Sequence, residues 1–119
     1  MVGALAACQG AWSLSATAST ISSSYTGPTN SDWNTAANWT PNGVPLNDLS
    51  NAYDVTVSAV NVSYDVGGSN AIDTLSLSSA NLTLNAGDNL TVNNSATIAQ
   101  SSVNANAATF MASGVTSFD

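Results

Sequence analysis

The chain has 119 residues and contains no Lys, Arg or His, so its seven aspartates give a formal net charge of −7. Without basic side chains no contact can neutralise phosphate, which excludes nucleic-acid binding and electrostatic attachment to anionic lipid. Without His, and with one Cys, the chain also lacks the usual zinc ligands and the Ser-His-Asp and Cys-His catalytic systems. We therefore expect a non-enzymatic protein with no catalytic residues, no cofactor and no metal.

The uncharged residues of the chain favour β-structure. Ser, Thr and Asn are abundant, whereas the strong helix formers Glu, Lys and Arg are absent. Val, Thr, Ser and Asn suit strands, turns and hydrogen-bonded ladders. The length is that of one domain. An all-β fold is the expectation.

Residues 1–20 form an apolar segment of small side chains. The segment is similar to the second half of a secretory signal, with Ala16 and Ala18 in an A-x-A cleavage pattern. It is too short and too often interrupted to span a bilayer, so no transmembrane span is expected. The positively charged start of a signal is missing, which leaves an apolar segment packed on the domain as the alternative.

Cys8 follows Leu5-Ala6-Ala7, and this tetrapeptide is similar to a bacterial lipoprotein box. The similarity implies cleavage before Cys8 and attachment of a lipid to its sulfur. The alternatives are an ordinary signal or a buried thiol, since one Cys forms no disulfide within the chain.

Residues 21–53 read as a polar lead-in followed by a segment rich in Trp and Pro. The polar residues 19–31 fit either a first short strand or a linker. Trp33 and Trp39 lie six residues apart and precede Pro41 and Pro45. One interpretation is a cap in which the two indoles cover the open end of the following domain. The other is a sugar-binding platform in which Trp33, Trp39 and Tyr53 stack on a carbohydrate.

Residues 54–119 alternate polar and apolar side chains in short runs, which predicts strands over 54–58, 60–66, 74–77, 81–84 and 89–92, with a weaker continuation to 103. Corners are expected at 67–70, 79–80 and 86–88. Strands of about four residues separated by so few corner residues are too closely spaced for a β-sandwich, which is the alternative fold. They indicate roughly three coils of a β-solenoid with an apolar interior and Asn and Ser ladders at the bends.

The pattern resembles the amino-terminal region of large bacterial exported proteins of the autotransporter-passenger and PEP-CTERM types. The resemblance covers about residues 31–98 and rests on W-x5-W, a Gly-Val-Pro, and the runs I-x-x-L-x-L and N-L-T-L-x-x-G-x-x-L-T-V. It implies the start of a right-handed parallel β-helix preceded by a capping segment. It also implies an extracellular or cell-surface location, with association to the outer membrane in some members, and a role in surface display, adhesion or matrix building.

The aspartates do not form a recognisable catalytic or metal-binding pattern. Asp54 and Asp65 are the candidate acids of a polysaccharide hydrolase, but no spacing places them as an acid/base pair. The segments 65–70 and 85–89 match neither an EF-hand loop nor the calcium-binding nonapeptide repeat. Turn chemistry accounts for both segments.

The leading hypothesis is a secreted or surface β-solenoid module with a structural or adhesive role. Its expected partners are a surface polysaccharide or a second copy that adds to an open sheet edge. The alternatives are a carbohydrate-binding module that uses exposed tryptophans and a non-catalytic fragment of a carbohydrate-active enzyme.

Overall fold

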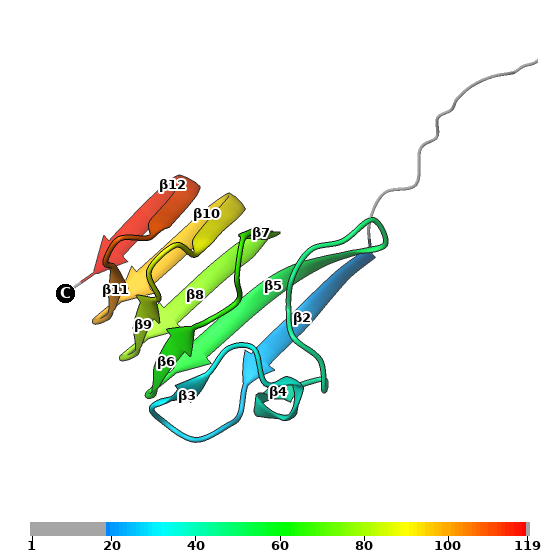
Figure 1. Cartoon of the computed structure of the whole chain (residues 1–119), viewed down its shortest axis with the longest axis horizontal. Helices are drawn as coiled ribbons and strands as arrows, with labels where there is room; N and C mark the ends of the chain where they lie inside the picture. The colour runs from blue at the N-terminus through cyan, green and yellow to red at the C-terminus, as the bar shows by residue number, and fades with distance from the viewer. Residues whose placement is uncertain (1–18, 119) are drawn as a thin grey trace, which may run out of the picture.

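A computed structural model describes residues 19–118, which form a parallel β-solenoid whose coils stack side by side (Figure 1). The predicted all-β solenoid is confirmed. The alternative of a β-sandwich is wrong, because the strands of successive coils pair in parallel. Cys8 and the segment 1–18 lie outside the described residues, so the signal and its lipidation stay predictions. No helix within residues 19–118 has the length and hydropathy of a membrane span.

The larger sheet has seven strands in the order β12-β10-β8-β5-β2-β4, and β7 pairs with the first half of β10. Every pair in this sheet is parallel except β2 with β4. The strands are Ser19–Tyr25 (β2), Trp39–Thr40 (β4), Asn51–Ser58 (β5), Ser69–Ile72 (β7), Thr74–Ser78 (β8), Asn89–Ala99 (β10) and Thr109–Phe118 (β12).

The smaller sheet has four strands in the order β11-β9-β6-β3, and it lies on the opposite side of the core (Figure 1). Its strands pair in parallel throughout. They are Ser31–Asp32 (β3), Asn61–Tyr64 (β6), Asn81–Leu84 (β9) and Ser102–Ala105 (β11). A short 3-10 helix at Ala36–Asn38 (η1) precedes β4.

The later coils have an almost constant length. Asn61 lies beside Asn81, 20 residues further on, and Asn81 lies beside Ser102, 21 residues further on. A slip of one residue would turn every following side chain to the other face of the sheet. The coil with 21 residues accommodates its one extra residue as a bulge in β10, where the register shifts between Val92 and Ser95.

Residues in the left-handed region close the corners. Ala59, Ser79 and Gln100 have φ angles of 60°, 51° and 50°, and they follow the long strand in three successive coils. At the opposite corner, Gly87 and Ala107 have φ angles of 86° and 56°. Since such angles are uncommon outside Gly, the repeated use of other residues shows that stacking of the coils fixes these corners.

The interior consists of rows of side chains that run from coil to coil. One row contains Ser23, Val55, Leu75 and Ala96, each at most 1% exposed. On the smaller sheet Val62 packs beside Leu82 and Tyr64 packs beside Leu84; these four side chains are also buried. The apolar alternation that predicted the strands is therefore the alternation between interior and solvent.

The first coil begins earlier than expected and is longer than the others. β2 pairs with β5 from Ser19 to Ser24, and Ser19 lies beside Asn51, which makes this coil much longer than the later ones. Residues 19–25, for which a first short strand and a linker were both open, form the first strand of the solenoid, although the coils were expected to begin at residue 54. The extra length forms η1, β4 and the loop to β5, and β4 pairs antiparallel with Ser24 and Tyr25 at the end of β2.

The expected strands within 54–92 are present, and the corners at 79–80 and 86–88 are confirmed. One expected corner is partly wrong. The segment 67–70 was expected as a turn, but Ser69 already begins β7, and Asn89 of β10 lies beside it. The pairing partner supplied by the next coil overrides the local turn preference.

Leu77 tests the importance of the rows, because it is fully buried between Val57 and Ile98 of the neighbouring coils. Replacing Leu77 by Ala leaves a cavity that a close-packed stack cannot fill. We expect Leu77→Ala to lower the free energy of unfolding by about 2–5 kcal/mol, measured by urea denaturation. Ser78→Ala changes the next, exposed residue and should alter stability by less than about 0.5 kcal/mol. Equal effects of the two substitutions would contradict the assigned register.

Candidate functional site

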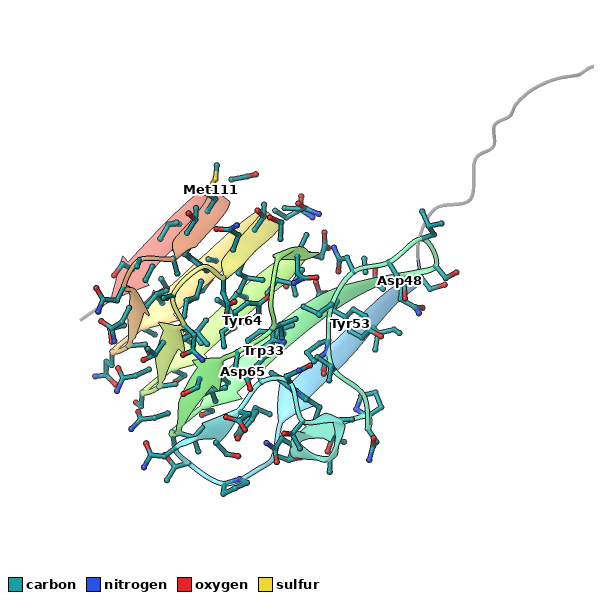
Figure 2. The ribbon with its side chains drawn as sticks, viewed as in Figure 1. Trp33, Asp48, Tyr53, Tyr64, Asp65 and Met111 are labelled. Carbon is teal, nitrogen blue, oxygen red and sulfur yellow. The ribbon has the colours of Figure 1, made fainter. Side chains whose placement is uncertain are left out.

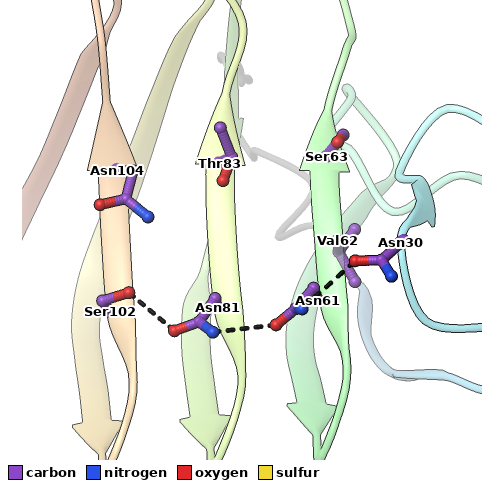
Figure 3. A pocket seen from close by; sticks show the side chains of 8 residues that line it. All are labelled: Asn30, Asn61, Val62, Ser63, Asn81, Thr83, Ser102 and Asn104. Atoms are coloured by element: carbon purple, nitrogen blue, oxygen red, sulfur yellow. Dashed lines mark hydrogen bonds between the residues drawn. The ribbon is translucent and has the colours of Figure 1, made fainter.

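A polar groove lies on the outer face of the smaller sheet (Figure 3). It is a shallow depression of about 380 Å³ that crosses three coils. Apart from Val62, its lining consists of neutral amides and hydroxyls: Asn30, Asn61, Ser63, Asn81, Thr83, Ser102 and Asn104. This groove is the candidate binding site.

The strand sequences explain why polar groups gather on this face. In Asn61-Val62-Ser63-Tyr64 and Asn81-Leu82-Thr83-Leu84, the apolar residues point inward and the polar ones outward. The parallel register then places the first residues of β6 and β9 side by side, and likewise the third residues. The coil repeat thus converts a local alternation into two polar rows.

The first row is a continuous hydrogen-bonded ladder, which Figure 3 shows as dashed lines. The Asn81 Nδ2 donates to Asn61 Oδ1 at 2.9 Å, and the Asn61 Nδ2 donates to Asn30 Oδ1 at 3.2 Å. The Ser102 hydroxyl donates to Asn81 Oδ1 at 2.7 Å. Every donor points toward the first coil, so the ladder has one direction along the solenoid and holds adjacent coils in register.

The second row consists of Asp32, Ser63, Thr83 and Asn104, one residue from each coil. These side chains take no part in the ladder. Asp32, Thr83 and Asn104 are exposed. They present hydroxyl and amide groups, with one carboxylate at the end near the first coil. A ligand that lies along this row meets donors and acceptors at the spacing between strands, about 4.7–4.9 Å.

Trp33 and Trp39 belong to the first coil and lie inside the protein. Figure 2 shows Trp33 next to Tyr64 of the second coil. The two tryptophans are 0% and 2% exposed, and their rings meet edge to face at 4.8 Å. Trp33 also packs against Tyr64, and Trp39 against Tyr25, both at 5.2 Å between centroids. The Trp39 Nε1 donates to the Trp33 carbonyl oxygen at 2.7 Å. The alternative in which Trp33 and Trp39 are exposed sugar-stacking groups is therefore wrong, and the two indoles pack together in the segment expected to form the cap.

Tyr53 does not join this aromatic cluster. It is half-buried against the core, and its backbone nitrogen donates to the side chain of Asn47 at 2.8 Å. The three residues of the expected sugar platform therefore do not share a surface. They contribute to packing of the first two coils.

Close packing fixes the start of the cap. The buried Asn38 donates from Nδ2 to the Asp32 carbonyl oxygen at 2.9 Å, and its own carbonyl accepts from Gly27 N at 3.1 Å. A Cβ atom added at Gly27 would lie 2.4 Å from Asn38 Oδ1. Gly27 is thus required by close approach of the chain to Asn38.

The candidate acids have structural roles. Asp54 lies on β5 of the larger sheet and accepts the Thr74 hydroxyl at 2.8 Å. Asp65 follows β6 of the smaller sheet and accepts Asn34 N at 3.0 Å. Each carboxylate joins neighbouring segments of the chain. Within residues 19–118 there is no group of three His, Cys, Asp or Glu side chains that could hold a metal ion.

No protein-family model, curated protein or solved structure matches the chain. The resemblance to bacterial exported proteins therefore rests on the sequence pattern alone.

Sequence reasoning anticipated ladders of Asn and Ser but placed them at the bends. The structure places the main ladder on the short strands and adds the second row that includes Thr83 and Asn104. A signal was available, because Asn61-x-Ser63 and Asn81-x-Thr83 recur 20 residues apart. That spacing acquires meaning only when the coil length is known.

Asn81 tests the ladder, because it both donates to Asn61 and accepts from Ser102. We expect Asn81→Ala to lower the free energy of unfolding by about 1–2 kcal/mol, since two partly exposed hydrogen bonds are lost. Asn106→Ala is the control, because Asn106 lies exposed in a turn beyond β11. Chemical denaturation should separate the two variants, and similar stabilities would show that the ladder contributes nothing.

Because the Tyr64 hydroxyl is buried, we expect the stability of the fold to depend on pH at alkaline pH. This hydroxyl is buried and, among the described residues, has no hydrogen-bond partner. Burial raises the pKa of Tyr64 to about 12, the charges of Asp88 and Asp65 add to this, and the side chain of Asn70 opposes it. The unfolded chain therefore loses this proton near pH 10, before the folded protein does.

The protonated Tyr64 hydroxyl makes its full contribution to the free energy of unfolding below about pH 10. This contribution is lost as the pH rises through about 12. The loss is on the order of 2 kcal/mol. Tyr64→Phe removes this titrating group and keeps the ring, so this variant should lose less stability than wild type over the same interval. Some loss remains, because burial also raises the pKa of Tyr25. Chemical denaturation at pH 8, 10 and 11.5 measures the free energy of unfolding of both proteins. The same decrease with pH in the wild type and in Tyr64→Phe would refute the prediction.

Proposed function

We propose that the chain is a non-enzymatic surface module of a bacterial exported protein, with a structural and adhesive role. Its adhesive surface is the polar groove on the smaller sheet, and the partner is a neutral polysaccharide. The observation that carries this proposal is the second row, in which Ser63, Thr83 and Asn104 line the groove outside the ladder and the last two are exposed to solvent.

The chemistry of the groove favours a neutral, hydroxyl-rich partner. Thr83 and Asn104 both donate and accept hydrogen bonds, and Asp32 accepts them. Sugar hydroxyls offer the same two functions along a repeating chain. An acidic polymer would meet a protein of charge −7 that contains no Lys, Arg or His to neutralise it. The partner is thus a neutral glucan or mannan in preference to a uronic acid polymer.

The structural role follows from the way the coils are joined. The interior rows and the ladder hold each coil to the next, so the groove is carried by a rigid stack. A rigid surface loses little conformational entropy on binding. This supports binding through many weak contacts along an extended partner instead of one deep pocket.

Two observations support a non-enzymatic role outside the cytoplasm. Asp54 lies on β5 of the larger sheet and Asp65 follows β6 of the smaller one, and each accepts a hydrogen bond from a neighbouring segment. The apolar start with Ala16 and Ala18 is similar to a secretory signal, and the pattern of residues 31–98 resembles exported surface proteins. A cell-surface location is part of the proposal on these grounds.

Binding to insoluble neutral polysaccharides tests the proposed function. We expect Thr83→Val to weaken the binding of a neutral glucan or mannan by about 2–10-fold, the loss associated with one hydrogen bond. Thr56→Val is the matched control, because Thr56 is also exposed but lies on β5 of the larger sheet. Binding should change little between about 0.05 and 1 M salt, since no cationic contacts exist to be screened.

Two outcomes would contradict the proposal. One is the absence of binding to any neutral polysaccharide by the folded wild-type chain. The other is equal weakening by Thr83→Val and Thr56→Val, which would place the contact elsewhere. Circular dichroism of each variant verifies that both substitutions leave the fold intact.

A further inference from the structure

The polar groove on the smaller sheet offers more contacts across the strands than along them. Strands β6, β9 and β11 have four residues each, so each strand turns two side chains outward. One of the two belongs to the hydrogen-bonded ladder and the other to the second row. A ligand parallel to a strand would therefore meet one side chain outside the ladder, whereas a ligand that crosses the coils meets one on each coil.

The two rows of the groove differ in what they offer a ligand (Figure 3). In the ladder, Asn81 donates to Asn61 and accepts from the next coil, so these groups already bind one another. The side chains that line the groove outside the ladder are Ser63, Thr83 and Asn104. A ligand that binds this second row leaves intact the contacts that hold the coils in register.

The parallel register makes the second row straight and evenly spaced. Ser63 lies beside Thr83, and Thr83 lies beside Asn104. Neighbouring strands of a sheet are about 4.7–4.9 Å apart, so a hydroxyl or amide group recurs at this interval along the row. A partner that binds several of these groups at once must carry its own polar groups along a straight line, at nearly the same interval.

We infer that the partner is an extended, neutral β-1,4-linked polysaccharide that lies across the coils, with one sugar on each coil. This inference rests on the proposed function and adds the linkage and the direction of the sugar chain. In a β-1,4-linked chain of glucose or mannose the sugars form a straight, flat ribbon. Each sugar advances by a distance close to the strand spacing of about 4.7–4.9 Å. Both edges of the ribbon carry hydroxyl groups, so one edge can follow the second row.

Helical polysaccharides do not match this row. Glucans with α-1,4 or β-1,3 linkages wind into helices, so the hydroxyl groups of successive sugars turn away from a common line. Such a chain can contact one coil but does not reach the next coils in the same orientation. Weak contacts strengthen one another only where the geometry lets them form together. The groove therefore selects the straight ribbon.

Titration calorimetry of the full chain with oligosaccharides of two, four and six sugars tests the linkage. The probes are β-1,4-linked glucose and mannose series, and α-1,4-linked glucose oligomers are the matched control because they differ from the first series only in linkage. In at least one β-1,4-linked series, affinity should rise at least about 10-fold from the disaccharide to the tetrasaccharide, as contacts on further coils are added. The α-1,4-linked tetrasaccharide should bind at least about 10-fold more weakly.

Substitutions on three coils test the direction of the sugar chain. Ser63→Ala, Thr83→Val and Asn104→Ala each remove one polar group from a different coil. Each should weaken binding of the β-1,4-linked tetrasaccharide by about 2–10-fold. Ser76→Ala and Thr56→Val are the controls and should leave binding unchanged, because Ser76 and Thr56 lie side by side on the larger sheet. Circular dichroism verifies that every variant is folded.

Three results would overturn the inference and leave the proposed function in place. The first is an α-1,4-linked tetrasaccharide that binds as tightly as its β-1,4-linked isomer. The second is a loss of binding in only one of the three groove variants, because the ligand would then lie along a single strand. The third is a neutral polysaccharide that binds the protein but is not displaced by a β-1,4-linked hexasaccharide. Absence of binding to every neutral polysaccharide and oligosaccharide would instead contradict the proposed function itself.

Discussion

The parallel register between successive coils is the constraint on which the rest of the molecule depends. It aligns Val62 with Leu82 and Tyr64 with Leu84, and so produces the core. The same alignment places Asn61 beside Asn81 and Ser63 beside Thr83 on the outside, and so produces the groove. Interior and surface are two faces of one repeat. The bulge in β10 shows how strictly this register is kept. The extra residue is left unpaired there, and the residues after it keep their inward or outward direction.

The alternating residues of 74–92 were sufficient to predict the solenoid, because each short run places its Leu or Val side chains on one face. β2 was harder to recognise. Its sequence, STISSSY, contains only two large apolar residues, and its pairing with β5 spans the long insertion of the first coil. β7 was missed for a related reason, since Gly67, Gly68 and Asn70 favour a turn locally but the neighbouring coil supplies a strand partner. Local preference predicts a strand well only where side-chain burial agrees with it.

The candidate site was less accessible to sequence reasoning than the fold. The tryptophans could be recognised as a group, but whether they stack on one another or on a ligand depends on the chain path that brings Trp33, Trp39 and Tyr64 together. The groove posed the reverse difficulty. Ser63, Thr83 and Asn104 are individually ordinary in a chain rich in Ser, Thr and Asn, and only the coil length makes them a row. The absence of Lys, Arg and His excludes many partners but does not locate the binding site of the one that remains.

The cap also gives the solenoid a fixed origin. The first coil takes a longer path, from Ser19 to Asn51, which includes η1 and β4, whereas the later coils repeat at the shorter, nearly constant length. Duplication or loss of one later coil would move everything beyond it by a single strand spacing, about 4.7–4.9 Å, and would leave the aromatic cluster unchanged. Proteins built on this plan can therefore change the length of the solenoid in equal steps while the first coil stays the same.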